Sequence, residues 1–111
     1  PVFAGRIIKY RILLGGYTGV EQLLEVYGIK GETLDLIQDK IFVDSTVIRK
    51  INPDTASFKE LLRHPYLEYE DVISLVKYRE FKGSIESKGE LQKNFILPDS
   101  VLERLLPYLD F

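Results

Sequence analysis

The chain has 111 residues, of which 45% are hydrophobic and 29% are charged, and its formal net charge is −2. Such a length and composition describe one ordinary globular domain or two very small ones. The near-neutral charge excludes a strong general attraction to polyanions, so any nucleic-acid binding has to be local. The absence of cysteine excludes disulfides and thiolate metal sites.

The sequence predicts a first helix after Pro1, because its apolar residues follow helical spacing. Phe3, Ala4, Ile7 and Tyr10 are expected on the buried face. Arg6 and Lys9 lie three residues apart on another face, in a stretch of twenty residues that contains no acid. Gly15-Gly16 is predicted to end this helix with a tight turn.

Two further short helices are predicted in the first half of the chain. Thr18-Gly19-Val20-Glu21 has the pattern of a capping box, and the helix that it opens has the apolar residues Val20, Leu23, Leu24 and Tyr27. Tyr27-Gly28-Ile29-Lys30-Gly31 is predicted to be a short hairpin, and Leu34, Ile37 and Ile41 indicate the next helix. Residues 43–50 break the helical period and predict an extended linker, or a short strand, packed between two units.

The second half of the chain repeats this organisation. Asn52 to Thr55 is expected to form a turn and start a helix, with Ser57-x-x-Glu60 as the alternative cap. A hairpin is predicted at Pro65 to Glu68, followed by a longer helix that ends at Gly83. Two short helices complete the prediction, one around Glu90–Asn94 and one that opens at Pro98-Asp99-Ser100.

A shift of 68 residues relates the two halves without a gap. Lys77-Tyr78-Arg79 repeats Lys9-Tyr10-Arg11, since 77 − 9 = 68. At the same shift Gly15 falls on Gly83, Leu23 on Leu91 and Leu34 on Leu102. Recurrence of the apolar frame is typical of a duplicated packing unit. The first copy lacks its front part, and the chain begins at Pro1 without any methionine, so we expect a piece of a longer protein.

These residues resemble the helix-hairpin-helix domain of ComEA-type competence proteins. The similarity rests on the order Asn52-x-x-Thr55-Ala56-Ser57-x-x-Glu60-Leu61, a hairpin, Val76-x-Tyr78-Arg79, Gly83 and Leu91. It implies an all-α fold of tandem helix-hairpin-helix units. Residues 1–42 would be the rear part of a first unit, 43–50 the linker and 51–111 a complete second unit. It also implies non-sequence-specific binding of double-stranded DNA in DNA uptake or competence, in the cell envelope or outside the cytoplasmic membrane.

The same resemblance defines a candidate DNA phosphate-binding site. Glycines in the hairpin let backbone N–H groups at a helix start approach a phosphate, and nearby Lys or Arg adds charge. In the first unit this site would comprise Arg6, Lys9, Gly28, Lys30 and Gly31. The alternatives are plain turn chemistry at the glycines and a solvated helix face at Arg6 and Lys9.

The hairpin of the second unit predicts a packing turn instead. Tyr66 and Glu68 replace the two glycines, and Glu68, Glu70 and Asp71 would repel a phosphate at the helix start. Tyr10 and Tyr78 are predicted to pack at the edge of the core rather than to stack on bases.

The sequence shows no arrangement of residues that suggests catalysis. It has a single histidine, His64, and no phosphate loop of the nucleotide-binding type. We therefore expect no enzymatic activity, no metal, no cofactor and no membrane span in this part of the protein. The rival function is a scaffold for protein–protein interaction that has lost DNA binding. Acids interleaved among Arg6, Lys9 and Lys30 would favour that scaffold.

Overall fold

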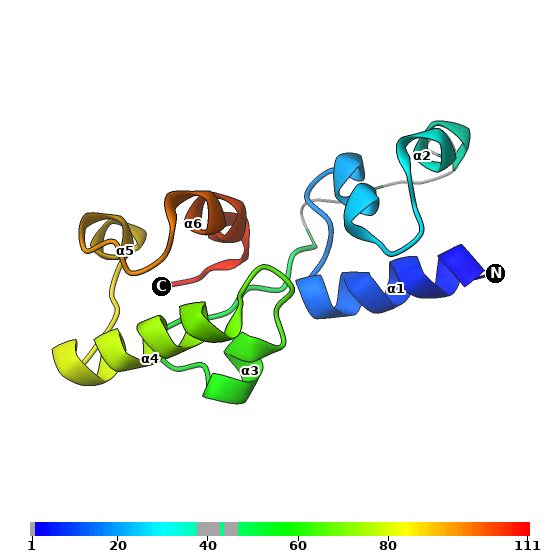
Figure 1. Cartoon of the computed structure of the whole chain (residues 1–111). Coiled ribbons are helices and arrows are strands. Elements are labelled where there is room, and N and C mark those ends of the chain that lie inside the picture. Colours follow the sequence, from blue (N-terminus) through cyan, green and yellow to red (C-terminus); the bar gives the residue numbers. More distant parts are fainter. Residues whose placement is uncertain (1, 38–42, 44–46) are drawn as a thin grey trace. The chain divides into compact units, whose positions relative to one another are not determined.

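The computed structural model describes residues 2–37, 43 and 47–111, and every regular element in these residues is a helix (Figure 1). The expected all-α class is therefore confirmed. The chain divides into two compact units, Pro1–Arg49 and Lys50–Phe111, which we call unit 1 and unit 2. None of the described helices is long and apolar enough to cross a membrane.

The described residues of unit 1 form one long helix and two short ones. Helix α1 spans Val2–Leu14, the 3-10 helix η1 spans Val20–Glu25 and helix α2 spans Gly31–Ile37. Gly15 and Gly16 end α1 with φ angles of 97° and 117°, a conformation that glycine adopts without strain. The predicted continuation of α2 to Ile41 lies outside the described residues, as do Pro1 and Phe42.

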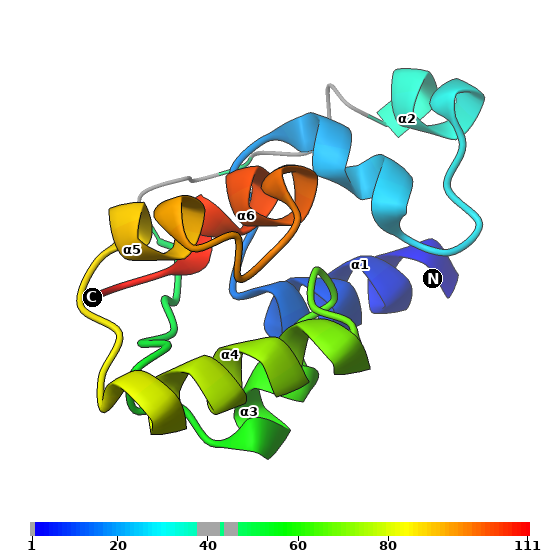
Figure 2. The same ribbon diagram turned by 60° about the vertical axis from the view of Figure 1, so that its left-hand side comes forward.

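Unit 2 contains α3 (Phe58–Leu62), α4 (Tyr69–Lys82), α5 (Lys88–Lys93), α6 (Asp99–Leu105) and the short 3-10 helix η3 (Leu106–Tyr108). In both ribbon views α3 lies on one side of α4 and the α5–α6 pair lies on the other (Figures 1 and 2). The Ser57 hydroxyl accepts a hydrogen bond from the Glu60 N–H, so the alternative cap predicted at Ser57 starts α3. The earlier residues, from Pro53 to Thr55, form a turn.

A short backbone bridge joins the two ends of unit 2. Ile51 and Leu109 form an isolated parallel bridge, in which the Ile51 N–H donates to the Tyr108 carbonyl at 2.7 Å and the Asp110 N–H donates to the Ile51 carbonyl at 2.9 Å. The core of unit 2 includes Leu61, Leu75 and Tyr108, each at most 1% exposed.

The helix bounds of the two units repeat at the spacing seen in the sequence. Adding 68 to the bounds of η1 and α2 gives 88–93 and 99–105, which are the bounds of α5 and α6. Adding 68 to α1 gives 70–82, and α4 covers 69–82. A cap recurs at the same shift, because Gln22 accepts from the Thr18 N–H and Glu90 accepts from the Glu86 N–H.

Two details of the predicted η1 helix are wrong. Gln22 caps it rather than Glu21, since the Gln22 side-chain oxygen accepts from the backbone N–H of Thr18 and Gly19. The buried apolar residues are Leu23 and Val26, spaced three apart, whereas Leu24 and Tyr27 are exposed. A 3-10 helix has three residues per turn, so the α-helical spacing assumed for Leu24 and Tyr27 selects the wrong face.

The predicted buried face of α1 is also partly wrong. Leu14 is buried and Ile7 and Tyr10 are half-buried, but Phe3 is 39% exposed and Ala4 is exposed. The part of the predicted linker that the structure describes near Arg49 packs within unit 1. The Arg49 N–H donates to the Gly15 carbonyl at 2.7 Å, and a Cβ on Gly16 would lie 2.9 Å from the Val47 carbonyl oxygen. Residues 44–46 lie outside the described part.

Candidate nucleic-acid interface

The hairpin of unit 1 joins η1 to α2 and depends on one glycine. Its residues are 26–30, and the Ile29 N–H donates to the Val26 carbonyl at 3.1 Å across the turn. Gly28, inside this turn, has a φ of 87°, in the left-handed region that other residues rarely adopt. Ile29 is 4% exposed and anchors the hairpin to the core. The backbone of the turn is therefore exposed around Gly28, while the buried side chain of Ile29 holds the turn to the core.

Arg6 is the predicted site residue that the structure brings against this hairpin. Its Nη1 donates to the Tyr27 carbonyl at 3.1 Å, and its guanidinium lies 4.8 Å from the centre of the Tyr27 ring. A Cβ on Gly28 would lie 2.6 Å from the same Nη1. Arg6 therefore positions the hairpin, and its remaining N–H groups are those that could reach a phosphate.

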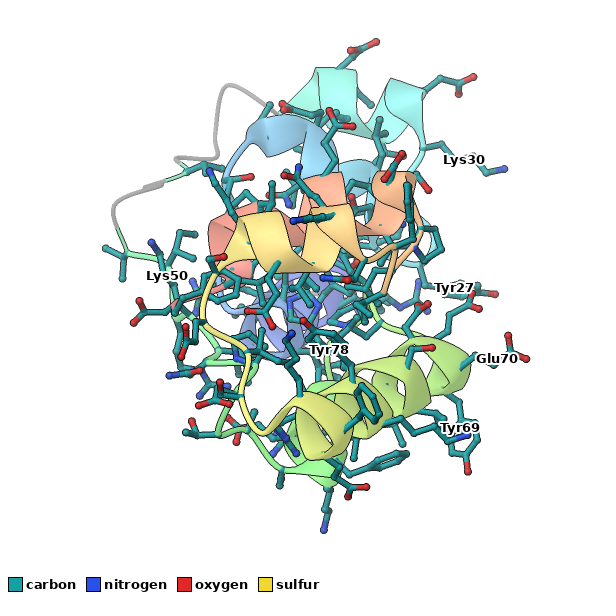
Figure 3. All side chains as sticks on the ribbon, turned by 90° about the vertical axis from the view of Figure 1, so that its left-hand side faces the viewer. Tyr27, Lys30, Lys50, Tyr69, Glu70 and Tyr78 are labelled. Atoms are coloured by element: carbon teal, nitrogen blue, oxygen red, sulfur yellow. The ribbon has the colours of Figure 1, made fainter. Side chains whose placement is uncertain are left out.

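The other predicted site residues are exposed around the hairpin. Lys30 is exposed, and Figure 3 shows its side chain extended away from the ribbon. Gly31 is the first residue of α2, and a Cβ there would have nothing within 4 Å, so packing does not require a glycine at this position. Lys9 is exposed on α1, about 60° around the helix axis from Arg6 at 100° per residue. The structure thus groups Arg6 with Gly28 and leaves Lys9, Lys30 and Gly31 accessible.

Charges around the hairpin are mixed. The first helical hydrogen bond of α2 runs from the Leu34 N–H to the Lys30 carbonyl, so the amides before Leu34 lack helical partners by geometry. Glu32 lies in the first turn of α2 and opposes an anion there, whereas Lys30 and Arg6 favour one.

The hairpin between α3 and α4 of unit 2 is a packing turn, as the sequence predicts. Tyr66 and Leu67 are each 5% exposed, and His64 is 3% exposed. The His64 Nδ1 accepts from the Tyr66 N–H at 3.1 Å, and the rings of both residues pack against Tyr108 at 5.2 and 5.9 Å. The side chain of Asp71 accepts from the Glu68 N–H, which places a carboxylate at the start of α4.

Tyr10 and Tyr78 occupy equivalent positions, and each donates a hydrogen bond to a glutamate. The Tyr10 hydroxyl donates to Glu25 at 2.8 Å, and the Tyr78 hydroxyl, labelled in Figure 3, donates to Glu90. The bond with Glu90 raises the pKa of Tyr78 to about 12, and the same bond lowers the pKa of Glu90. Both tyrosines join a long helix to the following short helix.

Sequence reasoning missed Tyr27 as a surface residue of the hairpin. The sequence places it among the apolar residues of the predicted helix as well as at the start of the hairpin, yet its side chain is 81% exposed beside Arg6. The spacing Val20, Leu23, Val26 contains the signal that would have found it, because three-residue steps along a 3-10 helix leave Tyr27 off the buried face.

Comparison with known proteins relates the first part of the chain to one motif. The model of the helix-hairpin-helix motif matches residues 1–42. The chain is 28% identical, over 92% of its length, to the Xenopus laevis protein named "Endonuclease/exonuclease/phosphatase family domain-containing protein 1", and it spans 22% of that protein. No solved structure matches. Helix-hairpin-helix motifs are generally associated with nucleic-acid binding, and the all-α fold is consistent with this motif.

Proposed function

We propose that the chain binds double-stranded DNA without sequence preference, through the hairpin of unit 1. The observation that supports this most is the match of the helix-hairpin-helix motif to residues 1–42, which include the hairpin with Gly28 in its left-handed conformation. Backbone amides at the start of α2, before Leu34, and the exposed cations Lys9 and Lys30 would contact phosphate oxygens. Such contacts position a protein on DNA and read no base sequence.

Arg6 has a double role in this proposal. Its bond to the Tyr27 carbonyl fixes the hairpin, and its positive charge lies beside the backbone that approaches the DNA. The hairpin between α3 and α4 of unit 2 is proposed to serve packing rather than DNA binding, because Tyr66 and Leu67 are buried and Glu70 and Asp71 lie in the first turn of α4. A role in DNA uptake or competence, suggested by the ComEA resemblance, belongs to the same proposal.

We further propose that the chain supplies DNA binding rather than catalysis. The name of the Xenopus relative includes nuclease and phosphatase terms, but the chain spans 22% of that protein. The sole histidine, His64, is buried, and its Nδ1 accepts a backbone N–H, so its position suits packing.

The test is a salt titration of binding to a labelled DNA duplex. The wild-type affinity should fall linearly with the logarithm of salt concentration, with a slope of about −0.9 for each phosphate neutralised. The variant Lys9→Glu/Lys30→Glu should bind more weakly and show a shallower slope. The control Lys59→Glu/Lys77→Glu changes the net charge equally at exposed positions of unit 2 and should lose less affinity.

Two outcomes would contradict the proposal. An equal loss of DNA affinity in the unit 1 variant and in the unit 2 control would mean that net charge, rather than the unit 1 hairpin, governs binding. The absence of binding by the wild-type chain at low salt would leave the protein-interaction scaffold as the better function, with Glu32 and the other acids near the hairpin as part of its surface.

A further inference from the structure

An aromatic side chain occupies the same hairpin position in both units. Tyr27 lies between η1 and α2, and Phe95 lies between α5 and α6, with 95 − 27 = 68. Their side chains are 81% and 80% exposed. The two hairpins therefore each present a large ring to solvent at equivalent places.

Exposure alone does not distinguish these two rings. Phe81, on α4, is 90% exposed, but its counterpart in α1 is the aliphatic Leu13. Recurrence at the hairpin position is what sets Tyr27 and Phe95 apart. Phe81 is consequently a matched control for an exposed aromatic outside the hairpins.

Phe95 also has an unfavourable backbone conformation. Its φ is 52°, which makes it the non-glycine residue with positive φ in the described part of the chain. A side chain in this region is strained, whereas glycine adopts it freely. The backbone at this position ends α5, where the Phe95 N–H donates to the Gln92 carbonyl and the Ile96 N–H donates to the Leu91 carbonyl, each at 3.3 Å. Glycine would make this turn without strain, so an exposed aromatic residue here suggests a role other than folding.

A cation lies beside the Tyr27 ring, and a cationic and a polar residue precede Phe95 in the sequence. The guanidinium of Arg6 lies 4.8 Å from the centre of the Tyr27 ring, and Lys30 follows three residues later. In unit 2, exposed Lys93 and Asn94 directly precede Phe95. A ring next to a cation suits a nucleotide, because the ring can stack on the base while the cation contacts the phosphate.

We propose that Tyr27 and Phe95 each stack on an unpaired base, so that DNA containing a short unpaired segment is the preferred ligand. This inference rests on the proposed DNA binding and specifies its substrate. In an intact duplex the faces of the bases are already stacked, so rings at the hairpins gain contacts only where pairing is interrupted. Each unit acts through its own hairpin.

The experiment compares two labelled DNAs, an intact duplex and the same duplex with a central bubble of mismatched bases. Wild-type protein should bind the bubble more tightly, by about fivefold or more for each stacked base. Tyr27→Ala/Phe95→Ala should lose this preference, so that its affinities for the bubble and for the intact duplex become equal. Phe81→Ala should keep both properties.

A second variant separates binding from folding. Phe95→Gly relieves the positive φ, so it should raise the thermal stability of the protein while it weakens bubble binding. A ring that served only the fold would give the opposite stability change. The Arg6 bond to the Tyr27 carbonyl involves backbone, so it is retained when the Tyr27 side chain is replaced.

The outcomes distinguish this inference from the proposal on which it rests. Wild-type protein that binds duplex and bubble equally, or a double alanine variant that keeps the bubble preference, would overturn base stacking and leave duplex binding intact. Failure of wild-type protein to bind either DNA at low salt would overturn both. Loss of bubble preference in Phe81→Ala would show that exposed aromatics act without regard to the hairpins, which also overturns the inference.

Discussion

Helices α1 and α4 are equivalent in sequence position but differ in burial. Val72 and Leu75 of α4 are 0% and 1% exposed. Their counterparts in α1, 68 residues earlier, are Ala4, which is exposed, and Ile7, which is half-buried. The same apolar spacing therefore produces a helix in both units, but the apolar residues of that helix are buried to different extents.

A pair of arginines shows what covers α4. The Arg79 Nη1 donates to the carbonyls of Pro53 and Ala56 at 2.9 and 2.7 Å. Arg79 therefore links α4 to the turn that precedes α3. Its counterpart Arg11 is exposed on α1. The comparison shows that spacing in a sequence predicts which face of a helix is apolar, whereas burial depends on the elements that pack against that face.

The largest expected difference between the two helices is the loss of stability when an apolar residue is replaced by alanine. Leu75→Ala should destabilise unit 2 by about 2–5 kcal/mol, because it leaves a cavity in a closed core. Ile7→Ala, at the equivalent position, should cost clearly less, since Ile7 is half-buried. Amide hydrogen exchange of α4 and of α1 measures the two losses separately. Equal losses would show that α1 is as well packed as α4.

The next largest difference in stability is expected between alanine variants of the two equivalent arginines. Arg79→Ala removes charge-assisted bonds to two carbonyls and should cost about 2 kcal/mol, a figure reduced for its partial exposure. Arg11→Ala should change the free energy of unfolding by less than about 0.5 kcal/mol. Chemical denaturation of both variants checks this, and Arg79→Lys tests whether one Nη1 shared between two carbonyls is the essential feature. A large loss in Arg11→Ala would contradict the comparison.

The two glycines of the unit 1 hairpin should also behave differently. Gly28→Ala should destabilise unit 1 by about 1 kcal/mol, because its φ is 87° and the new methyl group would press on Arg6 and Phe3. Gly31→Ala should be neutral or slightly stabilising, since alanine favours a helix and has space there. Thermal unfolding of the two variants, which differ only in the position of one methyl group, makes the measurement. The reverse order would mean that the hairpin backbone differs from the one described.

The smallest expected effect is a pH dependence of the bond between Tyr78 and Glu90. The folded-state pKa of Glu90 is lowered, so its contribution to stability is present at neutral pH and is lost as pH falls through its folded-state value. The folded-state pKa of Tyr78 is raised to about 12 from 10.0, so its contribution is present below pH 10 and is lost as pH rises through about 12.

Unfolding of wild type and Tyr78→Phe across pH tests this bond. The difference in stability between the two proteins should be constant near neutral pH and should shrink at both extremes. Tyr69→Phe, on the same helix, controls for the loss of one tyrosine chromophore. A stability difference that does not change with pH would mean that the hydroxyl contributes through packing alone.

Much of this fold can be predicted from the sequence, because the helices follow apolar spacing and glycines mark several of their ends. Ser57 as a cap and Gly83 as a stop illustrate this, since each acts through its nearest neighbours. The type of η1 could not be predicted as readily, because 3-10 and α-helical spacing differ little over six residues.

The sequence indicates candidate residues for the site, but it does not indicate how they are arranged. Gly28 is recognisable as a turn residue from the sequence alone. The bond between Arg6 and the Tyr27 carbonyl joins positions 21 residues apart, and it depends on the path of the chain through η1. The exposure of Phe95 at a positive φ likewise contradicts the usual preferences of phenylalanine, so no local rule would place it at the hairpin.

The bridge between Ile51 and Leu109 determines how unit 2 responds to mechanical force. In a parallel pair the chain leaves the two strands in opposite directions, so tension along the chain on either side of unit 2 loads its two hydrogen bonds in shear. Both bonds must then rupture together before the tension reaches the helices. The bridge therefore holds the two ends of unit 2 together, and its helices extend only after these two hydrogen bonds break.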